Sequence, residues 1–388
     1  MSGAEIVSWP FEFASIEGFA EKPSATKLQV LPDGNFVVAS AFARPLLSKF
    51  APTSSALAPT MSDMRLEAKV GPDSLAVVGG LHESEFGDID LAVIHAGSMS
   101  GWMKKLLGKK FNDKTGTDLV QFLDDKGESS AVSTTHMQIK KGKFEIRRDR
   151  ESGLLWDLWF LGDYVFGLTP SHMWRERYLH MQLEKRETLR NDLLGNFQIH
   201  RDEGGSFWSL MENGRLARFE YTEDKAKPTL KRLPGLDKNH GFERSAASKT
   251  DGWLYGVSGA GTELFRVRRN AVTFEEEIQN LWTTEAPITA LTAVDTEEAP
   301  QLLVATEGKD GAGLYSFALI KPEDPELLPD IPPAVAVANV KDVPRVSVLT
   351  WDWTSKEKAI VWGAEGYFGS DMDRPSSDKL HIVKIQLI

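Results

Sequence analysis

Short apolar runs separated by turn residues recur along this chain, and many of them alternate with polar positions. The apolar run at 28–31 leads into Pro32-Asp33-Gly34-Asn35 and is followed by the apolar run at 36–39. Asp-Gly adopts the positive φ of a tight hairpin turn, and β-branched and aromatic residues favour strands. The segment 27–42 therefore predicts a strand, a turn and a second strand.

Comparable units follow with different side chains. The seven units lie at 27–42, 64–95, 154–168, 195–221, 246–267, 288–319 and 345–388. Dividing 388 residues by seven gives about 55 residues per unit, near the roughly 40–50 residues of a propeller blade with some longer loops. In the better-formed units, strands such as 253–257, 302–305 and 314–317 are separated by Asp-Gly or glycine turns.

On this pattern the chain resembles the β-propeller superfamily, in which each blade is a four-stranded antiparallel sheet around a channel. The resemblance implies an all-β, seven-bladed β-propeller in which residues 1–388 form a single domain. Trp156-Asp157 and Trp351-Asp352 occur without the Gly-His signature of WD40 repeats, and double glycines occur only at 79–80 and 204–205. The pattern therefore assigns no subfamily.

The two ends of the chain fit one blade. Residues 5–13 alternate like a strand but belong to no unit, and the last unit, 345–388, contains only three convincing strands. We expect residues 1–14 to complete the last blade and close the ring. Such closure removes the open sheet edge that an unpaired strand presents.

Three segments depart from the β pattern. Residues 98–111 have helical spacing, with Trp102 and Leu106 on one side and lysines on the other, so we expect an insertion at 98–130 that carries a short helix. Residues 178–194 fit either a second short helix or a long edge strand. The proline-rich stretch 321–344 is expected to be a stiff connector between the last two units.

Composition limits the classes of function. With 45 Lys and Arg against 56 Asp and Glu, the formal net charge is −11, which disfavours nucleic-acid binding and favours a basic partner. The absence of cysteine excludes disulfides, thiolate metal sites and a cysteine nucleophile. No signal-like N-terminus and no apolar run of membrane-spanning length occurs, so we expect a soluble cytoplasmic protein without a membrane span.

No catalytic constellation emerges from the residues. The eight histidines lack zinc-binding spacing, and neither a Walker motif nor a Gly-x-Ser-x-Gly elbow occurs. The acidic stretches 83–90 and 370–378 contain the oxygen ligands that calcium prefers, but their spacing favours solvated turns over an EF-hand. We therefore predict no catalytic residues and no cofactor, and we assign no metal ligand.

Aromatic residues outside the predicted strands are candidates for a binding surface. Trp102, Trp174 and Trp282 fall in predicted loops or insertions, whereas tryptophans within predicted strands are expected to pack between blades. Trp174 lies in His172-Met173-Trp174-Arg175, a composition typical of interface anchors. Trp102, His172, Trp174 and Arg175 are the predicted binding residues.

These observations favour a monomeric, noncatalytic platform that binds another protein at one asymmetric site, because the units differ from one another. One concrete form is a cytosolic inhibitor or immunity-type protein that neutralises a basic partner. Two alternatives stay open. The first is a calcium-dependent hydrolase or lactonase at the propeller channel, and the second is a lectin.

Overall fold

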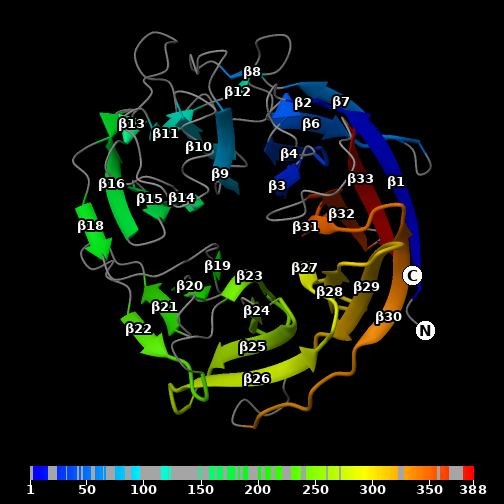
Figure 1. Ribbon diagram of the computed structural model, residues 1–388. Coiled ribbons are helices and arrows are strands. Elements are labelled where there is room, and N and C mark those ends of the chain that lie inside the picture. Colours follow the sequence, from blue (N-terminus) through cyan, green and yellow to red (C-terminus); the bar gives the residue numbers. More distant parts are fainter. Residues whose placement is uncertain are drawn as a thin grey trace. The chain divides into compact units, whose positions relative to one another are not determined.

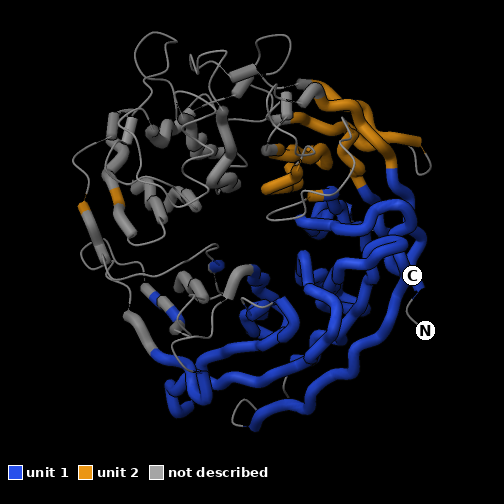
Figure 2. The backbone as a smooth tube through the Cα atoms, viewed as in Figure 1, with its two compact units in different colours: residues 1–8, 189–365, 383–388 blue, residues 9–188, 366–382 orange. Residues whose placement is uncertain are grey.

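The computed structural model describes the greater part of the chain in separate ranges. These are residues 3–15, 24–31, 33–41, 43–44, 47–53, 57–63, 65–66, 75–83, 89–96, 115–120, 122–123, 148–149, 157–161, 164–168, 173–179, 182–183, 187–190, 200–201, 206–210, 215–220, 229–236, 242–258, 261–270, 272–321, 327–355, 359–366 and 379–388. The chain forms two compact units, one of residues 1–8, 189–365 and 383–388, and one of residues 9–188 and 366–382 (Figure 2).

The described residues form strands and turns and contain no helix (Figure 1). Within these ranges, seven sheets have four or five strands and two further sheets have two. The expected all-β class is therefore confirmed. No helix in the described part of the chain is long and apolar enough to cross a membrane.

The first unit contains three complete antiparallel meanders. They are β19 (His200–Arg201), β20 (Ser206–Leu210), β21 (Arg215–Glu220) and β22 (Thr229–Arg232); β23 (Phe242–Ala247), β24 (Leu254–Ser258), β25 (Glu263–Arg269) and β26 (Glu276–Thr283); and β27 (Ile288–Val294), β28 (Gln301–Thr306), β29 (Gly311–Ala318) and β30 (Val335–Lys341). In each meander, every strand pairs with the next strand in sequence. This is the arrangement that the repeated strand-turn-strand pattern predicts.

A fourth sheet joins the two ends of the chain. Its order is β1 (Ala4–Glu12), β33 (Lys379–Leu387), β32 (Ile360–Glu365) and β31 (Val346–Trp351). The backbone amide of Ile388 donates a hydrogen bond of 2.9 Å to the carbonyl of Gly3. Strand β1 thus supplies the fourth strand that the sequence of the last unit lacks, whereas the closure of a ring by this strand stays a prediction.

The second unit contains three larger sheets and two strand pairs. The larger sheets are β3 (Ser24–Val30), β4 (Phe36–Ala41), β6 (Leu47–Ala51) and β7 (Thr60–Asp63); β9 (Leu75–Glu83), β10 (Ile89–Ala96), β11 (Thr115–Val120) and β13 (Arg148–Asp149); and β14 (Asp157–Leu161), β15 (Tyr164–Leu168), β16 (Met173–Leu179) and β17 (Gln182–Leu183), with β18 (Glu187–Arg190) also paired to β16. The pairs are β2 (Ala14–Ser15) with β5 (Ala43–Arg44), and β8 (Arg65–Leu66) with β12 (Phe122–Leu123).

The hairpin between β3 and β4 shows how the local sequence sets a turn. Gly34 has a φ of 80°, a conformation that glycine adopts without steric penalty. The backbone amide of Leu31 donates to the carbonyl of Asn35 at 2.7 Å, and Asp33 Oδ1 accepts from the amide of Asn35 at 3.0 Å. The predicted first hairpin is therefore confirmed.

Within the first unit, sheets pack face to face through apolar side chains. On β28, Leu302 and Val304 join the core shared with the β23–β26 sheet, while Leu303 and Ala305 join the core shared with β31 and β33. A strand buried on both faces needs a continuous apolar run, because successive side chains point to opposite faces. The run at 302–305 meets this requirement.

Two predictions from the sequence are corrected by strands. Thr115–Val120 forms β11, paired with β10 from Leu91↔Val120 to Ala96↔Thr115, although the segment was expected to lie in the insertion 98–130. Its Gly and Asp residues masked the β pattern, which cross-strand pairing overrides. The expected helix at 98–111 lies outside the described residues.

The expected proline-rich connector 321–344 also contains a strand. Val335–Lys341 forms β30, the fourth strand of its sheet. Prolines exclude regular strand pairing only where they stand, and Pro329, Pro332 and Pro333 all precede β30. Within 178–194, the described residues belong to strands β16, β17 and β18 and form no helix, but these are separate short strands rather than the one long edge strand of the alternative.

Candidate binding site

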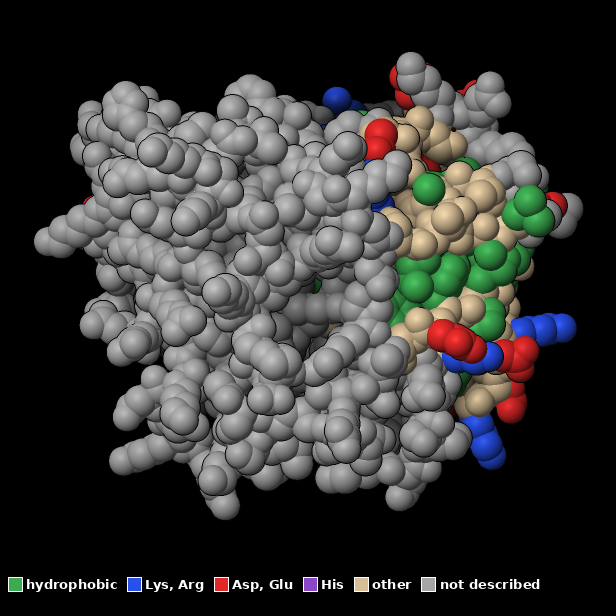
Figure 3. All heavy atoms as spheres, turned by 90° about the horizontal axis from the view of Figure 1, so that it is seen from above, with side chains coloured by type: hydrophobic (Ala, Val, Ile, Leu, Met, Phe, Trp, Pro, Cys, Tyr) green, Lys and Arg blue, Asp and Glu red, His purple; other side chains and the backbone are tan. Residues whose placement is uncertain are grey.

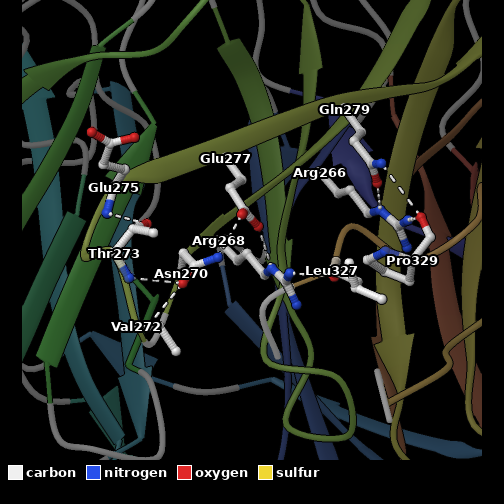
Figure 4. A network of polar contacts seen from close by, with 10 residues as sticks. All are labelled: Arg266, Arg268, Asn270, Val272, Thr273, Glu275, Glu277, Gln279, Leu327 and Pro329. Carbon is white, nitrogen blue, oxygen red and sulfur yellow. Dashed lines mark hydrogen bonds and ion pairs between the residues drawn. The ribbon is translucent and has the colours of Figure 1, made fainter. Parts of the chain in front are cut away.

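Two buried arginines on β25 form the centre of a polar network in the first unit. Arg266 and Arg268 are 2% and 7% exposed, and each stands directly opposite a polar residue of β26, in the pairs Arg266↔Gln279 and Arg268↔Glu277. Arg266 Nε donates to Gln279 Oε1 at 2.7 Å, and Arg268 Nε donates to Glu277 Oε2 at 2.6 Å (Figure 4). The cross-strand register therefore orients both guanidinium groups.

The outer nitrogens of both guanidinium groups hold the chain segment that precedes β30. We call this segment, residues 327–334, the strap. Arg268 Nη2 donates to the carbonyl of Leu327 at 2.8 Å. Arg266 Nη2 donates to the carbonyl of Pro329 at 2.9 Å (Figure 4). The same nitrogen donates to the carbonyl of Asp330 at 3.1 Å. The strap lies outside any strand, so these side-chain donors replace the ladder hydrogen bonds that its carbonyls lack.

The indole ring of Trp253 lies against the guanidinium groups of both arginines. The Cζ atoms of Arg266 and Arg268 lie 4.5 and 4.7 Å from the centroid of its ring, within the range of cation–π attraction. Trp253 is buried in the core between the β23–β26 and β27–β30 sheets. The guanidinium groups are thus held by an aromatic ring and by cross-strand partners, which leaves them little rotational freedom.

A second polar pair lies near Arg266. Tyr255 Oη donates to Asp251 Oδ2 at 2.5 Å, and the backbone amide of Trp253 donates to Asp251 Oδ1 at 3.1 Å. Burial raises the pKa of Asp251, against the opposing effect of these hydrogen bonds and of Arg266. Burial and the adjacent Asp251 raise the pKa of Tyr255 well above its usual value, and burial lowers the pKa of Arg266.

The strap turns large apolar side chains to solvent while its backbone is fixed. Leu327, Leu328 and Ile331 are 64%, 51% and 50% exposed, and Val335 at the start of β30 is 41% exposed. Pro332 is buried and Ala334 packs against the core, so the strap is also held by apolar contacts. In Figure 1 the strap, which leads into β30, runs along β26.

Exposure alone does not define a binding site. Hydrophobic side chains also appear on the described part of the face shown in Figure 3, and Leu57, in the loop between β6 and β7, is 65% exposed. Scattered apolar residues are normal on protein surfaces. The strap differs because its exposed residues are close in sequence and stand on a backbone that buried arginines hold. Ordering such a surface on binding costs little conformational entropy.

One serine–histidine contact lies elsewhere in the first unit. His200 of β19 and Ser245 of β23 lie 2.7 Å apart, Nε2 to Oγ. A hydrolytic site also needs a group that orients the imidazole and donors that stabilise an oxyanion, so this contact by itself does not define such a site. Nor do the described residues contain a group of three or more His, Asp or Glu side chains placed to hold a metal.

The binding residues predicted from the sequence are only partly placed. Trp102 and His172 lie outside the described residues. Trp174 lies within strand β16 and not in the loop that was expected. Arg175 of the same strand is buried, and its Nε donates to Glu187 Oε2 at 2.8 Å. The structure therefore does not bring these four residues together as a described site.

Trp282 also differs from expectation, because it lies in β26 rather than in a loop. Its ring lies 4.7 Å from that of Tyr315 and 5.7 Å from that of Phe317, which is a packing role. Its neighbours Gln279 and Asn280 gave a polar context that resembled a loop. The cross-strand pair with Leu264 places it in the sheet.

The sequence analysis did not predict the strap or the arginines that hold it. Two signals pointed to it: arginines at alternate positions of the strand 263–269, and the run Leu327-Leu328-Pro329-Asp330-Ile331, whose apolar residues a simple linker does not need. Arg266 and Arg268 stand opposite Gln279 and Glu277 only in one register of the two strands. The sequence of one strand does not specify that register.

No family model and no curated protein matches the sequence. Among solved structures, virginiamycin B lyase from Staphylococcus aureus is similar at a TM-score of 0.57 with 12% identity, covering 99% of this chain and 100% of that chain. The β-propeller domain of Cps50 (Swd1) from Myceliophteria thermophila is similar at 0.54 with 9% identity, covering 97% and 99%. The chain therefore has a β-propeller fold.

A further similar structure is YCF48 bound to D1 peptide, at a TM-score of 0.52 with 9% identity, covering 98% of this propeller and 95% of that chain. Identities this low establish the fold alone. By their names, these propellers include a lyase and a peptide-binding protein, so the fold does not choose between catalysis and binding. That choice depends on the residues of the site.

Proposed function

We propose that this β-propeller is a noncatalytic protein-binding platform and that the strap forms the centre of its binding surface. The observation that carries the proposal is the set of exposed side chains Leu327, Leu328 and Ile331 on a backbone held by Arg266 and Arg268. Burial of a charged arginine is costly because its guanidinium group loses contact with water, and both of these arginines hydrogen-bond to the strap as well as to β26. Their use here is explained if the conformation of that segment matters for binding.

The fold is compatible with this role. YCF48, a protein of similar fold, is bound to D1 peptide in its solved structure. We propose further that each of the seven larger sheets is one blade, that residues 1–388 form one domain, and that β1 closes the ring through its pairing with β33.

The partner is proposed to be basic. The net charge of −11 disfavours association with acidic molecules and speeds encounter with cationic ones. A cytosolic inhibitor or immunity-type protein that neutralises a basic enzyme is the concrete form of this proposal. Trp102, His172, Trp174 and Arg175 stay a prediction from the sequence, and the burial of Arg175 together with its ion pair to Glu187 makes that side chain a weaker candidate.

Affinity capture with strap variants tests the proposal. The tagged full chain and its Leu327→Asp and Ile331→Asp variants are incubated with extract from the source cells, and the proteins retained by each are compared. A basic protein retained by the wild type is then purified, and its Kd is measured for each variant. We expect each substitution to weaken binding by about 2 kcal/mol, since exposed apolar anchors dominate interfaces.

A matched control separates a surface effect from loss of folding. Leu57→Asp makes the same change at an equally exposed leucine outside the strap. All three variants should keep their stability within about 0.5 kcal/mol, because the replaced side chains are exposed. A partner that binds all three variants as tightly as the wild type would exclude the strap as the binding surface.

A further inference from the structure

We infer that the edge of β30 receives an extended, positively charged segment of the partner as an added β-strand, beside the apolar strap. This inference rests on the proposed protein-binding function and names the form of its ligand. Strand β30 stands at the end of its sheet, with β29 as its only strand neighbour among the described residues. Its outer backbone groups therefore face away from the ladder.

β30 differs from the corresponding strands of the other described sheets in its side chains. End strands normally carry charges or prolines that prevent pairing with other chains. Such residues occur in five other end strands: Glu5, Pro10 and Glu12 in β1, Asp63 in β7, Arg148 and Asp149 in β13, Lys231 and Arg232 in β22, and Glu276 and Glu277 in β26. The end strands β17, β27 and β31 also lack them, but β17 has only two residues and neither β27 nor β31 has an exposed residue. Residues 335–340 of β30 contain none, and Lys341 is its only charge.

The edge is short and interrupted, which suits a specific peptide better than open-ended aggregation. The register shifts between Leu314↔Ala338 and Tyr315↔Ala336, so Val337 is an extra residue on β30. A partner strand therefore meets a bent edge with Val335 and Asn339 exposed on it. Its backbone groups pair with β30, and its alternate side chains reach the strap leucines and Ile331.

The negative charge of this region favours a positively charged partner segment at the edge of β30. The described residues 327–342 contain two acidic residues against one lysine, so this segment is net negative, as the chain is. A second copy of this chain would bring another −11 to the same edge. A strand with alternating basic and apolar residues satisfies both features, because it offers positive charge along one face and apolar contacts along the other.

Synthetic peptides test the inference directly on the full chain. The probe is an alternating Lys-Val peptide of about ten residues, a common upper length for a strand. Its controls are an alternating Glu-Val peptide and a peptide with the same lysines and valines sorted into two blocks. Binding is measured by fluorescence anisotropy, and the amides of 335–341 are followed by hydrogen exchange. We expect protection of β30 by the Lys-Val peptide and about tenfold weaker binding of both controls.

Backbone methylation distinguishes strand addition from side-chain docking. One version of the probe is N-methylated at every lysine and another at every valine. In a paired strand, alternate amides face the neighbouring strand, so one version should lose binding and the other should keep it. Equal binding of both versions, or no protection of 335–341 by the unmodified peptide, overturns the inference.

Edge variants separate this inference from the proposed function. Val335→Lys and Asn339→Lys place charge on the edge, and Leu57→Lys is the matched control. We expect both edge variants to weaken the peptide and the captured partner about tenfold, and the control to weaken neither. A partner that depends on Leu327 and Ile331 but tolerates both edge variants would refute strand addition and leave the binding function standing. A partner that tolerates all variants would refute both.

Discussion

Tyr255 and Asp251 form a buried pair in which each side chain depends on the other. The Tyr255 hydroxyl donates to Asp251 Oδ2 at 2.5 Å, and both residues are buried. Tyr255→Phe removes the hydroxyl that donates to this oxygen. The free energy of unfolding should fall by about 1–3 kcal/mol, the penalty of an unsatisfied buried acceptor.

Urea unfolding measures this loss, with Tyr315→Phe as its control. Tyr315 is a partly buried core residue whose hydroxyl makes no hydrogen bond within the described part of the chain. Loss of the Tyr315 hydroxyl should change the free energy of unfolding by about 0.5 kcal/mol or less. Equal effects of the two substitutions would show that the bond to Asp251 does not stabilise the fold.

The carboxyl of Asp251 should leave a signature in the dependence of stability on pH. Burial raises its pKa above the usual 3.8, so the folded protein binds this proton more tightly than the unfolded chain does. The stabilisation from the protonated form is full below 3.8 and is lost as the pH rises through the raised value.

Comparison with Asp251→Asn isolates this carboxyl from the other acidic groups. We expect the free energy of unfolding of the wild type, minus that of the variant, to decrease as the pH rises above 3.8. Urea unfolding of both proteins at a series of pH values measures this difference in the free energy of unfolding. A difference that increases with pH would mean that Arg266 and the hydrogen bonds outweigh burial.

The strap is an element whose order depends on side chains of another strand. Arg268 joins Glu277 of β26 to the carbonyl of Leu327, and Arg268 and Glu277 are both largely buried. Arg268→Met keeps the length of the side chain but removes both bonds. We expect the free energy of unfolding to fall by about 2 kcal/mol, because Glu277 Oε2 loses its charged donor while Oε1 keeps its bond from Asn270.

The same variant should loosen the strap before it unfolds the sheet. Hydrogen exchange in 327–331 should accelerate more than exchange in β25 and β28, since local opening of the strap needs only its anchor to be absent. Arg269→Met is the control, because Arg269 bonds to Phe274 in the adjacent turn and not to the strap. Equal acceleration in both variants would show that Arg268 does not anchor the strap.

Structural elements that depend on local residues could be predicted from the sequence. Elements that depend on the register between strands could not. The Asp33-Gly34 turn and the continuous apolar run 302–305 identified strands correctly, since turn chemistry and burial on both faces are visible in a short window. Strand β30 was missed because the prolines before it dominated the segment. The arginine anchors were missed because the pairing of Arg268 with Glu277 joins two strands across a turn.

At the scale of the whole molecule, one sheet joins both chain ends through the pairing of β1 with β33. Ala4 and Ile6 of β1 pack on the core formed by β27–β33, beside Val383 and Ile385. This contact lies within the first unit, whose sheets share faces one after another. Loss of one end strand therefore exposes both a sheet edge and part of a shared core.

Removal of residues 2–14 tests how much the fold depends on β1. We expect the Tm to fall by about 5 °C or more, because β33 loses its neighbour and the core loses Ile6. Differential scanning calorimetry measures the shift. Ile6→Ser is the milder companion, expected to lower the free energy of unfolding by about 1 kcal/mol, and Glu5→Ser at an exposed position of the same strand is its control. If the truncated chain melts at the wild-type temperature, β1 does not stabilise the sheet and the proposed closure of the propeller by this strand is wrong.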